Sequence, residues 1–105
     1  MIEIHRVNTF DKNIIMEMTD GGEVILTARA VDCCDGTAEI LSIDGASFDM
    51  GKALLNAIDL MGIKKVVCKR DDMADVLKAL GFQKADGMYV LDLTGYFVSG
   101  CKIPE

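Results

Sequence analysis

The fold of this 105-residue chain can be read outward from Met50-Gly51-Lys52-Ala53-Leu54-Leu55-Asn56-Ala57-Ile58. Apolar residues recur in this stretch at intervals of three and four, the spacing of one face of an amphipathic helix, and the pattern continues to Met61. Gly62 follows, at the position where many helices end in a left-handed residue. Ser47 precedes the stretch and is the predicted N-cap. We therefore expect a helix that begins after Ser47 and ends at Gly62.

Four strands are predicted before this helix. Runs rich in Ile, Met, Val, Leu and Thr alternate there with short polar segments. Asp20-Gly21-Gly22 and Asp35-Gly36 supply residues that tolerate positive φ, so they predict tight turns between antiparallel neighbours. The predicted strands are Ile2–Val7, Asn13–Thr19, Glu23–Cys33 and Thr37–Ile43.

Three more strands and a second helix are predicted after it. The second helix has an apolar stripe, an aspartate at its start as the predicted cap, and Gly81 at its end. The strands form a fifth strand and a hairpin that turns at Asp86-Gly87. The stripe is Met73, Val76, Leu77 and Leu80; the cap is Asp71 or Asp72; the strands are Lys64–Cys68, Phe82–Ala85 and Gly87–Leu93.

The whole pattern predicts a single α/β (α+β) domain over residues 1–105, in the order β-β-β-β-α-β-α-β-β. The sheet is expected to be mixed and mainly antiparallel, with two helices. The strand–helix–strand crossover in the middle predicts that the fourth and fifth strands are parallel and that the crossover is right-handed.

Charge and hydropathy exclude several classes of protein. The formal net charge is −6, and residues 1–48 hold nine acidic and three basic side chains, so binding to nucleic acid is not expected. No run of apolar residues is long enough to span a membrane, and the N-terminus does not resemble a secretory signal. We expect a cytoplasmic protein that does not bind membranes.

The four cysteines predict neither disulfides nor a zinc site. Cys33 and Cys34 are adjacent, no Cys-x-x-Cys pair is present, and His5 is distant in sequence, whereas zinc ligands cluster. In an extended strand the side chains of Cys33 and Cys34 would point to opposite faces. Cys68 is more readily explained as a small buried residue than as a proton donor. The pattern assigns no role to Cys101.

The start of the first helix is a candidate anion site, because its first amide groups have no partner within the helix and carry partial positive charge. Gly51 would let a ligand approach the backbone closely. An ordinary loop capped by Ser47 explains the same residues equally well on local physics.

Two segments of the chain resemble motifs of the GNAT superfamily of N-acetyltransferases. Met50–Ile58 resembles the acetyl-CoA pyrophosphate motif, and Leu77-Lys78-Ala79-Leu80-Gly81-Phe82 resembles the later "klGF" signature. The resemblance implies that the cofactor, acetyl-CoA, lies between the fourth and fifth strands, and that the acceptor is an amine of a small molecule or a protein. It places cofactor contacts at Leu41, Ile43, Asp49, Met50, Gly51, Lys52 and Ala53.

The chain departs from the family pattern at several positions. Ala46 stands where the family usually has Gln or Arg, and Asp49 stands in place of the first glycine. Leu77 occupies the position of a tyrosine that protonates the departing thiolate in many members. Only residues 1–20 precede the meander, where the family usually has a strand and two helices. The alternative is a degenerate, non-catalytic module for oligomerisation or for binding a ligand or a protein.

Other candidate residues follow from the same comparison. Glu39 could act as a general base, although a solvated strand face is the more common explanation. Tyr89, Tyr96 and Phe97 could line a substrate cleft or the seam of a homodimer. The family assigns no catalytic residue to this chain. Four cations beside the fifth strand could meet the CoA 3′-phosphate or simply face solvent: Lys64, Lys65, Lys69 and Arg70.

Overall fold

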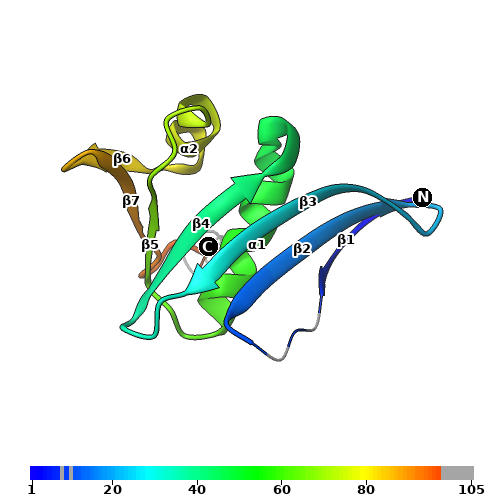
Figure 1. Ribbon diagram of the computed structural model, residues 1–105, viewed down its shortest axis with the longest axis horizontal. Coiled ribbons are helices and arrows are strands. Elements are labelled where there is room, and N and C mark those ends of the chain that lie inside the picture. Colours follow the sequence, from blue (N-terminus) through cyan, green and yellow to red (C-terminus); the bar gives the residue numbers. More distant parts are fainter. Residues whose placement is uncertain (8, 10, 98–105) are drawn as a thin grey trace, which may run out of the picture.

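The computed structural model describes residues 1–7, 9 and 11–97, so Cys101 lies outside the described residues. The described residues form a seven-stranded sheet, two α-helices and one 3₁₀ turn, in the predicted order (Figure 1). The strands are β1 (Ile2–Val7), β2 (Asn13–Asp20), β3 (Glu23–Asp32), β4 (Thr37–Ile43), β5 (Lys65–Cys68), β6 (Gln83–Ala85) and β7 (Met88–Asp92). The remaining elements are η1 (Asp44–Ala46), α1 (Phe48–Leu60) and α2 (Ala74–Leu80).

The sheet has the strand order β1-β2-β3-β4-β5-β7-β6. All neighbouring strands are antiparallel except β4 and β5, which are parallel as the crossover predicts. The β2–β3 and β6–β7 turns form at the predicted residues, which have positive φ. Gly21 and Gly22 lie at φ 62° and 91°, and Asp86 and Gly87 lie at φ 53° and 80°. Within the described residues, neither helix is long and apolar enough to span a membrane.

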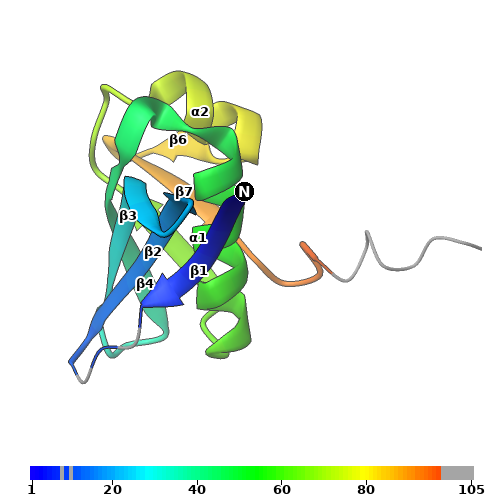
Figure 2. The same ribbon diagram turned by 90° about the vertical axis from the view of Figure 1, so that its right-hand side faces the viewer.

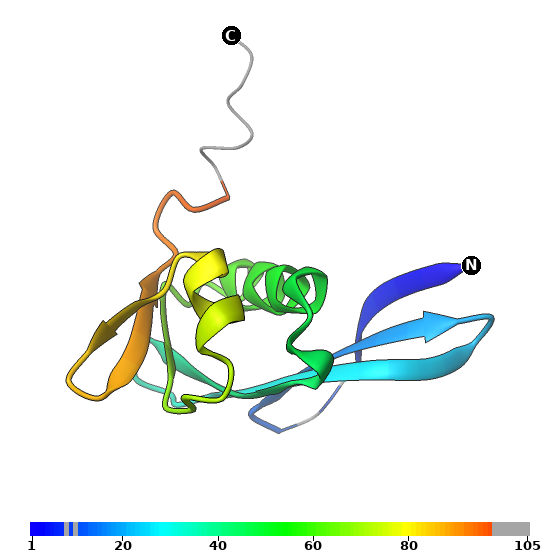
Figure 3. The ribbon, with the colours of Figure 1, turned by 90° about the horizontal axis from the view of Figure 1, so that it is seen from above.

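Both helices pack on the same face of the sheet, and β1 curls round to lie beside α1 (Figures 2 and 3). Their apolar stripes form the core, together with the side chains of the strands that face them. All four stripe residues predicted for α2 are buried. Met61, the last residue of the stripe predicted for α1, follows the helix and is 38% exposed, so its assignment to the core was wrong.

The predicted cap of the second helix was also wrong. Neither Asp71 nor Asp72 caps α2 with its side chain; Met73 holds the N-cap position, and the two carboxylates pair with Lys84 and Arg70 instead. A basic side chain within reach is a stronger partner for a carboxylate than one helix amide.

The vicinal cysteines do not lie in a strand. β3 ends at Asp32, so Cys33 and Cys34 both lie in the turn to β4, where both are exposed and Cys34 has φ 65°. The Asp32 carboxylate accepts the Cys34 N–H at 2.8 Å, which stabilises the turn and ends the strand earlier than the hydrophobic pattern predicts. The argument that these thiols point to opposite faces of a strand therefore fails.

Candidate functional site

In the middle of the sheet, the parallel pairing of β4 and β5 stops before β4 ends, and we call the place where this end of β4 is left unpaired the β4–β5 opening. β4 and β5 pair over only four positions, from Thr37 opposite Lys65 to Ile40 opposite Cys68. β5 then ends, whereas β4 continues to Ile43. A β-bulge at Leu41, where β4 has one more residue than β3, bends β4 at this point. The two strands consequently diverge toward the helices, as Figure 1 shows.

The start of α1 lies at the end of β4, directly after this opening. Ser47 is the N-cap, and its hydroxyl accepts the Met50 N–H at 3.3 Å. The Ser47 N–H reaches the Asp44 carbonyl at 3.4 Å. The amide groups of Phe48 and Asp49 are therefore the first-turn donors that the helix and its cap do not use. The predicted N-cap is confirmed. Because its hydroxyl accepts the Met50 N–H, that amide is not available to a phosphate.

Gly51 packs against the second helix. A Cβ built on Gly51 would lie 2.7 Å from Leu80 Cδ1 and 3.5 Å from Ile43 Cδ1. Gly51 is itself buried. The close approach of α1 to α2 therefore accounts for the glycine, whereas the sequence argument explained it by the approach of a ligand.

Lys52 directs its ammonium group at three aromatic rings. Its Nζ lies 5.1 Å from the Tyr96 ring centre, 5.7 Å from that of Phe97 and 5.9 Å from that of Phe48. Tyr96 is fixed in turn, because its hydroxyl donates to the Leu80 carbonyl at 2.6 Å. Cation–π attraction of this kind holds the ammonium group close to these three rings. Tyr96 and Phe97, which the sequence suggested for a substrate cleft or the seam of a homodimer, are partly buried and lie near Lys52, and Tyr89 is buried in the core.

A pocket of about 350 Å³ lies between η1 and the start of α2, beside the first turn of α1. Its lining is acidic, with three carboxylates and no lysine or arginine: Ala46, Asp71, Asp72, Met73, Ala74, Asp75 and Val76. The exposed carboxylate of Asp49 lies on the first turn of α1. Lys84 and Arg70 offset the charges of Asp71 and Asp72, so Asp49 and Asp75 carry most of the negative charge that opposes a diphosphate. The sequence argument identified the Ala46 and Asp49 departures but not the aspartates of this wall.

The four basic residues around β5 lie at opposite ends of the strand. Lys64 and Lys65 are at its start, away from the opening, and Lys64 pairs with Asp59 at 2.6 Å. Arg70 follows the end of β5 and reaches across to β4, where its Nη1 donates to the Leu41 carbonyl at 3.0 Å. Lys64 and Lys65 are therefore poorly placed for a ligand at the start of α1. The bridging role of Arg70 was missed, because a charge after a strand is usually solvent-facing.

Arg70 also forms a bidentate pair with Asp72. Its Nε donates to Asp72 Oδ1 at 2.9 Å, and its Nη2 donates to Oδ2. The hydrogen bonds and charge of this pair lower the pKa of Asp72 and raise that of Arg70. The guanidinium is thus held in one orientation by three N–H donors.

The residues considered for proton transfer have different environments. Glu39 alternates with Ala38 and Ile40, which are in the core, so it lies on the sheet face away from the helices; its Oε1 is 4.0 Å from Lys69 Nζ. Leu77 is fully buried in the core and places no acid there. Cys68 is also fully buried, and burial raises the pKa of its thiol, as expected for a structural residue.

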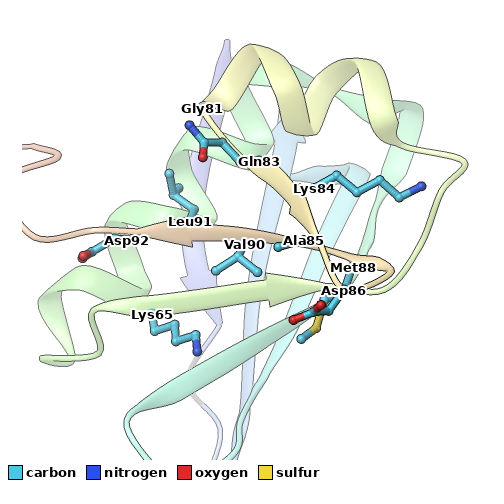
Figure 4. A pocket seen from close by; sticks show the side chains of 10 residues that line it. All are labelled: Lys65, Gly81, Gln83, Lys84, Ala85, Asp86, Met88, Val90, Leu91 and Asp92. Atoms are coloured by element: carbon cyan, nitrogen blue, oxygen red, sulfur yellow. The ribbon is translucent and has the colours of Figure 1, made fainter.

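A larger pocket, of about 600 Å³, lies around the β6–β7 hairpin, at the β6 edge of the sheet (Figure 4). Its lining comes from β5, β6, β7 and their turns, and includes Lys65, Lys84, Asp86 and Asp92. None of the residues from Leu41 to Ala53 that were predicted to contact acetyl-CoA lines it; of the four cations considered for the CoA 3′-phosphate, Lys65 does. It is therefore distinct from the opening between β4 and β5.

Comparison with solved structures identifies the fold of this chain. A Bacillus subtilis acetyltransferase solved in complex with CoA aligns with a TM-score of 0.68 and 10% identity, over 89% of this chain and 99% of its own. A GNAT family acetyltransferase from Elizabethkingia anophelis with acetyl-CoA bound gives 0.65 and 13%, over 86% and 95%. The GNAT domain of Streptomyces lividans PAT gives 0.58 and 21%, over 81% and 62%. The chain has the GNAT fold.

The evidence for the GNAT fold is structural. No family model matches the sequence, and no curated protein matches it in sequence comparison. The mixed sheet, the parallel β4–β5 pair and the two helices on one face confirm the fold that the two motifs indicated. At identities of 10% to 21% the likeness establishes the GNAT fold, and the chemistry has to be argued from this chain's own residues.

Proposed function

We propose that this chain binds acetyl-CoA and transfers its acetyl group to an amine. The observation that carries the proposal is the opening where β4 leaves β5 at Ile40 and Cys68, followed directly by the first turn of α1. Two structures that share this fold hold CoA or acetyl-CoA, which supports a ligand of the same type here. The comparisons lend no such support to the non-catalytic alternative.

The backbone supports this ligand better than the side chains do. Beyond Ile40, the β4 groups of Leu41 and Ile43 face the side from which β5 is missing, and they can pair with amide groups of the pantetheine arm. The first-turn amides of Phe48 and Asp49 would meet the diphosphate. Against this, the carboxylates of Asp49 and Asp75 lower the affinity for a polyanion. We therefore expect weak binding of the cofactor.

Met50, Gly51, Lys52 and Ala53 would support the site indirectly. They form the first turns of α1, and the contact of Gly51 with Leu80 fixes where that helix begins relative to α2. Their proposed role is to hold the unused amides of the first turn in place beside the opening.

The bound thioester would supply an activated acyl group. An amine attacks such a group only when it is unprotonated, and Glu39, which pairs with Val67 across the β4–β5 ladder, is an acidic side chain on the sheet face away from the helices. We propose that Glu39 accepts the proton that the amine loses as the new C–N bond forms and the C–S bond breaks. The net charge of −6 favours a cationic amine as the acceptor.

Isothermal titration with acetyl-CoA and with CoA tests the first step. We expect micromolar to millimolar binding by the wild type. Asp49→Asn removes one carboxylate from the first turn of α1 and should tighten binding. Asp86→Asn is the matched control, because it removes the same charge in the β6–β7 turn, where Asn tolerates positive φ equally well. Absence of binding by all three proteins would contradict the proposal and favour a non-catalytic module.

A screen of amine acceptors tests the second step. Product should be measured as acetylated amine by mass spectrometry, because Cys33 and Cys34 are exposed and would react with thiol reagents used to detect free CoA. Glu39→Gln should lower kcat at every pH at which the wild type is active, because the attacking amine still has to release one proton, and should leave the affinity for acetyl-CoA unchanged. Equal rates for the wild type and Glu39→Gln at all pH values would exclude this base.

A further inference from the structure

The side chain of Arg70, which follows β5, reaches across the β4–β5 opening to β4. Its Nη1 bonds the carbonyl of Leu41, the first β4 residue beyond the last pair with β5. Leu41 is also the extra residue of the β-bulge. The guanidinium therefore donates to the backbone carbonyl of Leu41 at the position where β4 is no longer paired with β5.

Asp72 holds Arg70 in this position. The carboxylate accepts from both Nε and Nη2, which fixes the plane of the guanidinium and leaves Nη1 directed at Leu41. Both partners lie in the segment between β5 and α2, and each is about half exposed. A planar, bidentate pair of this kind loses little additional entropy when it makes the third bond.

We propose that Arg70, held by Asp72, is a gate that closes the β4–β5 opening in the free protein and turns away when an acyl-CoA binds. This inference rests on the proposed function. An amide-containing arm entering along β4 would need the Leu41 carbonyl and the space beside it, and Arg70 now takes both. The measured affinity is then the intrinsic affinity reduced by the fraction of molecules in which the gate is open.

Two variants that change the net charge in opposite directions distinguish a gate from an effect of charge alone on acyl-CoA binding. Arg70→Ala removes the bond to Leu41 and one positive charge, which by charge alone weakens the binding of an anion. Asp72→Asn removes one negative charge and the bidentate anchor. Each has a matched control: Lys69→Ala removes the neighbouring positive charge, and Asp71→Asn removes the neighbouring carboxylate of the same pocket.

The experiment is isothermal titration of acetyl-CoA into the wild type and the four variants, after circular dichroism has shown that each is folded. The gate predicts that Arg70→Ala and Asp72→Asn each bind about fivefold tighter than their own controls, which corresponds to the net worth of one ordinary intramolecular hydrogen bond. Either variant failing to exceed its control overturns the gate while leaving the proposed function intact. Silence from all five proteins overturns both.

Discussion

Replacing Gly51 by alanine distinguishes a packing constraint from a ligand constraint at the start of α1. The new methyl group would lie 2.7 Å from Leu80 Cδ1, well inside van der Waals contact, and Leu80 is buried at 2% exposure with little room to move. If Gly51 served only the approach of a ligand, the same change would meet no obstacle in the free protein.

The two explanations predict opposite signs. Alanine in place of a helical glycine stabilises by about 1 kcal/mol through helix propensity. Overpacking against Leu80 costs roughly 1 to 3 kcal/mol. We therefore expect Gly51→Ala to leave the free energy of unfolding unchanged or to lower it by up to about 2 kcal/mol. A ligand constraint alone predicts an increase of about 1 kcal/mol.

Urea unfolding followed by circular dichroism measures this difference, provided that the m-value stays constant. The control background is Leu80→Val, which removes both δ carbons and with them the close contact. In that background Gly51→Ala should stabilise by about 1 kcal/mol, so the two substitutions should couple by roughly 1 to 3 kcal/mol. Equal stabilisation in both backgrounds would refute the packing argument.

Three further results are expected. Ser47→Ala removes the hydroxyl that accepts the Met50 N–H and should lower the free energy of unfolding by about 1 kcal/mol in urea titrations. The Asp72 carboxyl should titrate below its ordinary pKa of 3.8 in NMR experiments and return to it in Arg70→Ala; its contribution to stability is present above pH 3.8 and is lost as the pH falls through the lowered pKa. A titration that is the same in both proteins would exclude the ion pair in solution. Cys68, which is buried, should be alkylated only on unfolding, whereas the two exposed cysteines of the β3–β4 turn should react in the native protein, as peptide mapping by mass spectrometry can verify.

Most of the fold could be predicted because its signals are local. The glycines of the β2–β3 and β6–β7 turns, the stripe of α2 and the N-cap Ser47 each act through neighbours within a few residues. The strand before Cys33 was predicted too long, because the hydrophobic pattern continues after the Asp32 carboxylate has already turned the chain. A competing side-chain hydrogen bond of this kind is weakly encoded in composition.

The candidate site was less predictable, because its determinants join distant parts of the sequence. The partner of Gly51 is Leu80, on the other helix, so a local argument could only explain the glycine by its freedom or by a ligand. Arg70 reaches Leu41 on a strand that lies before α1. The likeness to CoA-binding motifs predicted a site at the start of α1, but the contacts of Arg70 beside that site depend on where β5 ends.

The single parallel pair gives the sheet a seam. On one side of it lies the β1–β4 meander, on the other the β5–β7–β6 ribbon, and each is built from antiparallel neighbours. The hairpins of the meander and the β6–β7 hairpin join residues close in sequence, whereas β4 and β5 meet only after α1, and β5 and β7 only after α2 and β6. Because local contacts form before non-local ones, the hairpins should gain protection from hydrogen exchange during refolding before both ladders of β5 do. The strand beside which a ligand would enter is then also the strand that joins the sheet last.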